Sequence, residues 1–406
     1  MIWIIAAVTL LLILARPWRV SEGVWACLGA ALLLVFRIVT PRDALASVGR
    51  GTDVYLFLTG MMLLAELARR EGVFDWIAAD AIHLARGSPT RLFTIVYAVG
   101  TLVTVFLSND ATAVVLTPAV LAAVRKARAT PLPYLLICAF IANAASFVLP
   151  ISNPANLVVY GSKMPPLEAW LKSFALPSVV AIAVTFFVLR FAMRKHLRDS
   201  VERKVEQPEL SRAGKFAAGG ILGTGVLLML ASSFGLDLGL PTFLAALLVA
   251  VMVGSPFRVL KHISWSVLFL VAGLFVVVAA VDRAGVLGLS RHLFQQAGEA
   301  SRATGSLASA FGVALLANVV NNLPVGLIAG SAIQGAHIPQ LIRNAVLIGV
   351  DLGPNLSITG SLATILWLVA LRREGEDVGF FEFLRYGVLV MAPALALSVL
   401  TLILIN

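Results

Sequence analysis

The strongest constraint on this chain is a series of apolar runs, each about 14 to 20 residues long, that recurs from one end to the other. A helix of ~20 residues crosses the ~30 Å hydrocarbon core of a bilayer, so each run spans it or nearly spans it. Of the 406 residues, 60% are hydrophobic and 13% are charged. A soluble domain of this length cannot bury so much apolar surface. The sequence therefore predicts an all-α membrane protein.

The basic net charge does not point to a nucleic-acid partner. In a soluble protein +10 would suggest one, but in a membrane protein lysine and arginine gather in cytoplasmic loops. The two cysteines, Cys27 and Cys138, lie in separate apolar runs without paired or CxxC spacing. Neither a disulfide nor a thiolate metal site is expected, and no cofactor is predicted.

Matches between the two halves of the chain indicate an internal duplication. At one constant spacing, residues Val54, Gly60, Arg70, Gly72, Val73 and Asn109 meet Val267, Gly273, Arg283, Gly285, Val286 and Asn322. At a shorter spacing, Asn156-Leu157 and Gly161-Ser162 meet Asn355-Leu356 and Gly360-Ser361. The preserved order predicts two copies of one fold.

We therefore expect a first repeat at 1–195, a cytoplasmic linker at 196–214 and a second repeat at 215–406. Each is predicted to hold about five transmembrane helices, one amphipathic segment and one re-entrant hairpin. The hairpins are expected at 91–124 and 304–336, and helices broken at mid-membrane at 134–163 and 340–371. The other spans are predicted at 2–15, 23–39, 54–68, 170–189, 215–231, 238–254, 264–281 and 383–405, with amphipathic segments at 73–86 and 286–299.

The segment 91–124 fits two models. It could be two ordinary spans, with Ser108-Asn109-Asp110 as an almost loopless turn at one surface. It could instead be a re-entrant hairpin with those residues at its tip near the midplane. Non-helical backbone at that depth is tolerated only where protein or water satisfies it, which these polar side chains suit. We favour the hairpin.

The distribution of lysine and arginine predicts the orientation in the membrane. With hairpins that return to their own side, each half crosses an odd number of times, so the second half is inverted. In that arrangement 22 of the 31 Lys and Arg residues fall on one side and nine on the other. The rich side includes the linker 190–215 and is assigned to the cytoplasm of an inner-membrane protein. Both termini are then predicted to lie outside.

Four polar clusters interrupt the apolar runs at matching places in the two halves, and proline or glycine accompanies three of them. Proline removes a backbone donor, so the helix must open, and an opened helix exposes amide ends that bind polar groups. Paired broken helices are the best pointer in a sequence to the binding site of a transporter. The predicted substrate-binding residues are Ser108, Asn109, Thr112, Asn153, Asn156, Asn321, Asn322, Asn355 and Thr359. For the neighbouring Asn143 and Asn318, a purely structural hydrogen-bonding role stays open.

Asp110 and Asp351 are the candidate proton-coupling residues. A carboxylate at bilayer depth costs at least ~2.5–3.5 kcal/mol on insertion scales, and no basic residue lies near either one in the sequence. Such a group coordinates a cation or takes up a proton. No phosphate-binding GxxxxGK[ST] loop or GxSG protease motif occurs, and the five histidines fall outside the spans. The sequence therefore predicts a transporter and no enzyme.

The stretch Asp351–Trp367, DLGPNLSITGSLATILW, resembles the arsenical pump membrane protein family. So do SNDATAVVLTP, ISNPANLVV and NNLP, which begin at Ser108, Ile151 and Asn321. The resemblance covers essentially the whole chain, although the Asn-containing hairpin and the Asn-Pro break occur more widely in the ion-transporter superfamily. It implies efflux of arsenite and antimonite in exchange for protons and, in some members, association with a soluble ATPase.

The residues themselves are compatible with arsenite, an uncharged trihydroxy species near neutral pH that both donates and accepts hydrogen bonds. Asparagine amides offer both capacities. The alternative is a sodium–proton antiporter of the same superfamily, because Asp110, Asp351 and carbonyls at broken helices could coordinate sodium. Whether the chain forms a homodimer, and whether an ATPase binds the linker, stays open.

Overall fold

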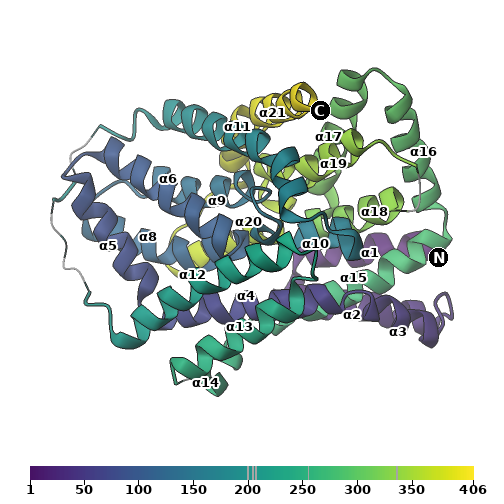
Figure 1. Cartoon of the computed structure of the whole chain (residues 1–406), viewed down its shortest axis with the longest axis horizontal. Helices are drawn as coiled ribbons and strands as arrows, with labels where there is room; N and C mark the ends of the chain where they lie inside the picture. The colour runs from purple at the N-terminus through teal and green to yellow at the C-terminus, as the bar shows by residue number, and fades with distance from the viewer. Residues whose placement is uncertain (199–200, 204, 206–207, 255, 335–336) are drawn as a thin grey trace.

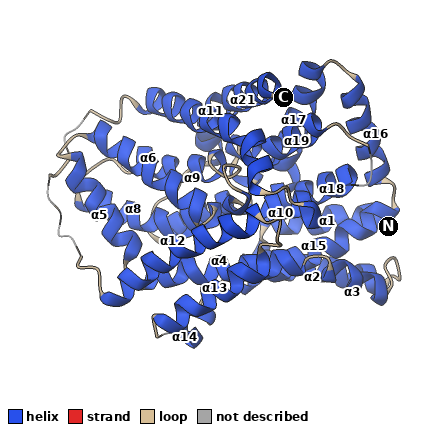
Figure 2. Cartoon of the chain, viewed as in Figure 1, coloured by secondary structure: helices blue, strands red, loops and turns tan. Residues whose placement is uncertain are grey.

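The computed structural model describes residues 1–198, 201–203, 205, 208–254, 256–334 and 337–406, and over that range every regular element is helical (Figure 2). The first half contains α1 (Ile2–Ala15), α2 (Glu22–Val35), α3 (Pro41–Gly49), α4 (Thr52–Arg70), α5 (Val73–Ala85), α6 (Pro89–Phe106), α7 (Asn109–Ala111), the π-helical turn η2 (Thr112–Leu116), α8 (Thr117–Lys126), α9 (Leu132–Ala144), η3 (Pro150–Ser152), α10 (Pro154–Tyr160) and α11 (Leu167–Met193).

The second half contains α12 (Arg212–Ser233), α13 (Gly239–Met252), α14 (Pro256–Leu260), α15 (Trp265–Arg283), α16 (Val286–Glu299), α17 (Arg302–Val320), α18 (Asn322–Gln334), α19 (Gln340–Leu352), η5 (Gly353–Leu356), η6 (Ile358–Gly360), α20 (Leu362–Arg373) and α21 (Phe380–Ile405). Most predicted segments are present as helices with nearly the predicted bounds. Helix α3 falls where no element was predicted; it meets α4 at an angle of 51°.

Six of the described helices are long and apolar enough to cross a membrane: α6, α11, α12, α15, α17 and α21. The bent pair α3 and α4 brings the number to seven if it counts as one span. The predicted spans at α1, α2, α9 and α13 are apolar but only 13 or 14 residues long. At 1.5 Å per residue they reach about 20 Å, less than the hydrocarbon thickness.

Two helix pairs, each made of one helix from either half, form the base of the molecule: α4 lies along α13, and α15 lies along α2. Glycine permits both approaches. A Cβ atom at Gly60 would lie 2.8 Å from the backbone carbonyl carbon of Thr242, and one at Gly273 would lie 2.6 Å from that of Ala26. These are two of the glycines that match between the halves in the sequence.

The starts of the same pairs are also joined in the same way. The Oδ1 atom of Asp53 accepts a hydrogen bond from the Gly239 backbone N–H at 2.6 Å, and the Oγ atom of Ser266 accepts one from the Gly23 N–H at 3.2 Å. Each acceptor caps the amino-terminal end of a helix from the other half, where unpaired N–H groups need partners. The two halves are therefore interlocked rather than packed side by side.

The amphipathic helices mark opposite ends of the molecule. In Figure 1, α5 lies at the left with the end of α11 and the start of α12, whereas α16 and both chain termini lie toward the right. Helices α5 and α16 each begin after a glycine in the left-handed region, Gly72 with φ +71° and Gly285 with φ +87°. The same turn thus occurs once at each end.

Described parts of the connection between α11 and α12 are tied to the left end of the bundle. The backbone N–H of Val201 donates to Gly87 O at 3.2 Å, and that of Glu202 donates to Ala127 O at 2.9 Å. The His83 Nε2 atom lies 2.8 Å from Val205 O. This segment was predicted as a cytoplasmic linker; its described residues hold α5, the start of α6 and the end of α8 together.

The close helix contacts at Gly60 and Gly273 allow the packing of the two helix pairs to be tested. We expect Gly60→Val and Gly273→Val each to lower stability by roughly 1–3 kcal/mol, because the added atoms overlap backbone that cannot withdraw easily. Thermal unfolding of the purified protein in detergent measures the effect. Gly223→Ala in α12 is the matched control, since a Cβ there meets nothing within 4 Å. Equal melting temperatures for all three variants would contradict the packing described.

Candidate functional site

The first half contains a sharp break between α6 and α7. Ser108 has φ 134° and ψ 164°, a backbone region that residues other than glycine rarely adopt, and its Oγ atom accepts a hydrogen bond from the Ala111 N–H at 3.4 Å. The helix that restarts at Asn109 passes through the π-helical turn η2 before α8, and such turns are frequent at functional sites. This break is the predicted tip of segment 91–124.

The second half contains the same feature between α17 and α18. Asn321 has φ 78° and ψ 150°, and its Oδ1 atom accepts a hydrogen bond from the Leu323 N–H at 3.3 Å. The next residue in each half is an asparagine, Asn109 and Asn322. Both side chains are buried, and both Oδ1 atoms lack a hydrogen-bond partner among the described residues. Unpaired buried amides at two matching positions are typical of a binding site rather than of a packed core.

A second pair of breaks separates α9 from α10 and α19 from α20. Helix α9 already ends at Ala144, before the prolines that were predicted to break it, and α19 ends at Leu352. The ends of α9 and α19, and the starts of α10 and α20, are separated by the same number of residues. Asn143 therefore corresponds to Asp351, and Asn153 corresponds to Ser361.

This register corrects the predicted match of Asn156 with Asn355. Asn156 lies inside α10, and its Nδ2 atom donates to the carbonyl oxygens of Ser146, Leu149 and Pro150 at 2.9 to 3.3 Å. Asn355 lies in η5, where its Nδ2 atom donates to Phe140 O at 3.0 Å. Both side chains donate to backbone carbonyls, those of a break for Asn156 and one inside α9 for Asn355.

The two tips and the starts of α10 and α20 meet around a small pocket. Among its lining residues are Asn109 and Asp110 from the first tip, Asn322 from the second tip and Asn153 at the start of α10. Its volume is about 10 Å³, about the space that one water molecule needs. No lysine, arginine or histidine is among the described residues that line it. The site is thus a small polar enclosure with three amides and one carboxylate.

A much larger cavity of about 670 Å³ leads from this pocket toward one end of the molecule. Leu58, Asp110, Pro154 and Val267 line both spaces, so Asp110 stands where the cavity meets the pocket. Charged side chains of both signs line the rest of the cavity: Glu66, Arg69, Asp75, His262, Arg373 and Glu374. Of these, Glu66 forms ion pairs with Arg69 and Arg70, at 2.7 and 3.1 Å.

The structure brings together only part of the predicted binding set. Ser108, Asn109, Asp110, Asn153 and Asn322 line the cavity or the pocket. Thr112, Asn156, Asn321, Asn355, Thr359 and Asp351 line neither. Instead, the Oγ1 atom of Thr112 lies 2.8 Å from that of Thr104, the Asn321 Nδ2 donates to Thr359 O at 3.3 Å, and Thr359 Oγ1 donates to Asn318 O at 2.9 Å. The sequence grouped all of these by their polarity, which does not say where a side chain points.

Asp351 is fully buried behind the pocket. Its Oδ1 atom accepts a hydrogen bond from Asn153 Nδ2 at 2.8 Å, and its Oδ2 atom has no partner among the described residues. The Oδ1 atom of Asn153 in turn accepts from the Ala155 N–H at 3.0 Å and so caps α10. Asn153 therefore joins the pocket on one side to Asp351 on the other.

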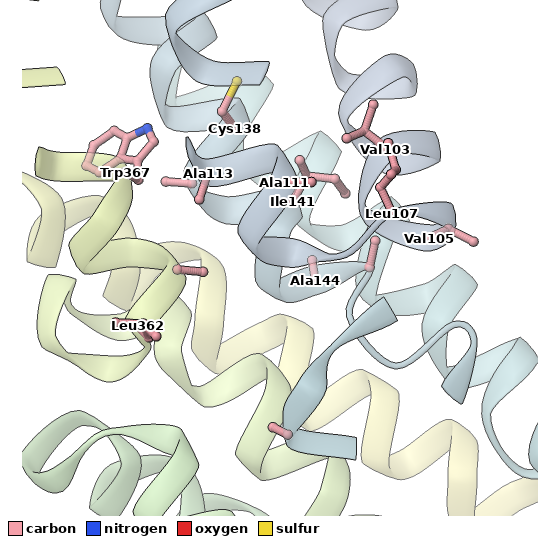
Figure 3. Close-up of a cluster of buried hydrophobic side chains, with 14 of the residues drawn as sticks. Val103, Val105, Leu107, Ala111, Ala113, Cys138, Ile141, Ala144, Leu362 and Trp367 are labelled. Carbon is pink, nitrogen blue, oxygen red and sulfur yellow. The ribbon is translucent and has the colours of Figure 1, made fainter. Parts of the chain in front are cut away.

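Apolar side chains hold the first tip in place. Figure 3 shows Val103 and Leu107 from the end of α6, Ala111 and Ala113 after the break, and Ile141 of α9 around it. All but Ile141 and Ala113, which are fully buried, keep only small exposed fractions. Sequence reasoning missed these residues and the apolar lining at Leu58 and Val267, because a buried apolar residue in a span carries no signal of its own.

The breaks, the polar pocket and the cavity define a multi-pass membrane transporter of the secondary type. The chain belongs to the citrate transporter family (CitMHS), whose model matches residues 8–349. This membership confirms the prediction that the chain is not an enzyme.

Three comparisons place the chain among known proteins. It is 26% identical to the arsenical pump membrane protein of Escherichia coli (strain K12), with 98% of this chain and 97% of that one covered. It is 24% identical to an uncharacterized transporter of Synechocystis, with 96% and 94% covered. Its fold is similar to that of the YdaH transporter of Alcanivorax borkumensis, with a TM-score of 0.57 and 14% identity over 89% of this chain and 86% of that one.

We expect Asn156 to contribute to stability and Asn109 to contribute to binding, so substitutions at the two positions should differ in their effect on the melting temperature. Asn156→Leu should lower the stability by about 1–3 kcal/mol, because carbonyl oxygens in the break lose their donor. Asn109→Leu should leave the melting temperature in detergent nearly unchanged, because none of the described residues hydrogen-bonds its Oδ1 atom. A lower melting temperature for Asn109→Leu than for Asn156→Leu would show that the two roles are assigned the wrong way round.

Proposed function

We propose that this chain exports arsenite, and also antimonite, in exchange for protons. The observation that carries the proposal is the composition of the pocket: three amides and one carboxylate, with no cationic side chain among its described lining residues. Uncharged As(OH)₃ needs both donors and acceptors, which asparagine amides supply. It would sit where Asp110 borders the pocket and the cavity. The relatives named as arsenical pump membrane proteins support this substrate.

Citrate, which the family description names, fits the site less well. A tricarboxylate carries several negative charges at neutral pH, and burying them without a cationic partner is costly. In the larger cavity, Arg69 is already paired with Glu66, and Arg373 stands beside Glu374 in the chain. The balance of signs along this cavity favours an uncharged solute.

We further propose that the two halves are inverted repeats around this site, with α6–α8 and α17–α18 as re-entrant hairpins. The matching strained residues Ser108 and Asn321, the matching turns at Gly72 and Gly285, and the reciprocal helix pairs at the base support the duplication. The positions of α5 and α16 at opposite ends support the inversion (Figure 1). The hairpin assignment also explains why polar side chains line a pocket between the two tips.

By this topology the end that carries the linker faces the cytoplasm of an inner-membrane protein, and both termini lie outside. The large cavity, lined at its wide part by Arg69 and Arg373, then opens toward the cytoplasm. Arsenite enters there and binds beside Asp110. A proton from the outside favours the alternate state, and the difference in affinity between the two states supplies the coupling.

Transport into inside-out vesicles tests the substrate and the coupling. With an imposed pH gradient we expect accumulation of arsenite that is independent of sodium. Asn109→Ala and Asn322→Ala should each reduce the initial rate at least about fivefold, since leaving a buried polar group of an uncharged ligand without its hydrogen-bond partner costs ~1–3 kcal/mol. Ser232→Ala in α12 serves as the matched control, because Ser232 is buried and lines neither the pocket nor the cavity.

Three other outcomes would each contradict the proposal. If sodium collapses the pH gradient and no arsenite accumulates, the chain is a sodium–proton antiporter. If citrate accumulates and arsenite does not, the pocket binds an anion despite its composition. If the asparagine variants transport arsenite at the wild-type rate, the substrate binds elsewhere.

A further inference from the structure

The carboxylates of Asp110 and Asp351 occupy different places relative to the path of the solute. Asp110 lies on the wall shared by the cavity and the pocket, and it makes no hydrogen bond or ion pair with any residue that the structure describes. Asp351 lines neither space, and Asn153 stands between it and the pocket, since the Asn153 Nδ2 atom donates to its Oδ1 atom. A group that exchanges protons with the solution during a transport cycle must face that solution in at least one state. Asp110 meets this condition in the present structure, and Asp351 does not.

The first half of the chain contains a neutral version of the Asp351 contact. At the end of α9, the Oδ1 atom of Asn143 accepts a hydrogen bond from the Ser361 hydroxyl at 3.3 Å. Ser361 caps α20, since its Oγ atom accepts from the Thr364 N–H at 3.0 Å. At the end of α19, the Oδ1 atom of Asp351 accepts from Asn153, the residue that caps α10. Each contact joins the last turn of one half's helix to the capping residue of the other half.

The reciprocal arrangement shows what such a position requires. Asn143 fulfils the role with an amide oxygen and no titratable group. An uncharged oxygen acceptor at the end of α9 is therefore sufficient to hold the residue that caps α20, and the same chemistry would suffice at the end of α19 for the residue that caps α10. No cationic side chain hydrogen-bonds or pairs with Asp351 among the described residues. A negative charge is not required at this position for the contact with Asn153.

We propose that Asp110 alone is the proton carrier, and that Asp351 is a positioning residue that fixes Asn153 and the start of α10 at the pocket. This division rests on the proposed arsenite–proton exchange. Asp110 breaks the symmetry of the two tips, because its counterpart after Asn322 is Leu323. The one carboxylate among the described residues that line the pocket thus belongs to the tip at the end of the cytoplasmic cavity.

Several other charged groups share the cavity with Asp110 and could affect the pH dependence of transport. They are Glu66 and Arg69 on α4, Asp75 on α5, His262 before α15, and Arg373 and Glu374 at the end of α20. Glu66 is held in its ion pairs, and His262 lies beside Arg70, with 3.0 Å between Arg70 Nη2 and the ring Nδ1. His262→Gln therefore serves as a control for titration elsewhere in the cavity.

The test compares Asp110→Asn with Asp351→Asn in inside-out vesicles. Gradient-driven accumulation of arsenite should fall at least tenfold for Asp110→Asn, whereas exchange of labelled for unlabelled arsenite without a gradient should persist and lose its pH dependence. Asp351→Asn should keep accumulation within about twofold of wild type, with the same pH profile. Asp351→Leu should reduce both accumulation and exchange at least tenfold, because Asn153 loses its acceptor. His262→Gln should leave the profile unchanged.

A second variant guards against misfolding of Asp351→Asn. The double variant Asp351→Asn with Asn153→Ser recreates the Asn143–Ser361 pair in the other half. Because Asn153 also lines the pocket, this variant serves only as a folding control, and we expect its melting temperature in detergent to be close to that of wild type. Coupling that survives in Asp110→Asn, or that is lost in folded Asp351→Asn, would overturn the assignment. The assignment would also be overturned if Asp351→Asn and the double variant both failed to fold while wild type folds. If wild type itself does not accumulate arsenite, the proposed function fails instead.

Discussion

Interrupting a helix inside an apolar interior leaves backbone N–H and C=O groups that solvent cannot reach, and meeting that demand organises the centre of this protein. Four interruptions lie close together in the fold. Particular side chains donate to carbonyl oxygens in the breaks: Asn156 and Trp170 in the first half and Asn318 in the second. Asn355 donates to Phe140 O inside α9. Many of the polar side chains at the centre therefore hydrogen-bond to backbone groups of the protein.

The binding site consists of the polar groups that remain after this demand is met. Asn109 and Asn322 follow strained residues that turn the chain sharply, and their amide oxygens find no protein partner among the described residues. The strain at Ser108 and Asn321 is retained because the flanking helices fix both ends of each break. In the interlocked base, α4 lies along α13 and α15 lies along α2. Leu58 of α4 and Val267 of α15 line the pocket together with residues of both tips.

The sequence predicted the helical class, the segments that contain breaks and the residues at both tips, because each depends on a local signal: apolar length, proline, or a polar residue in an apolar run. It placed the break after α9 too late, since that helix ends at Ala144, before the prolines. It could not predict that Asn156 faces backbone while Asn153 faces the pocket. These residues lie within one turn of each other, and only the packing of α10 against α18 and α19 distinguishes them. Helix α3 escaped prediction because Pro41–Gly49 is neither apolar nor long.

The central claim is that one solute site lies between the two tips, beside Asp110. It is tested most directly by a crystal structure of the protein with arsenite, with diffraction measured on both sides of the arsenic absorption edge. The account predicts a single anomalous peak within hydrogen-bonding reach of Asn109, Asn322 and Asp110. A peak at another place in the cavity, or at Cys27 or Cys138 alone, would contradict it.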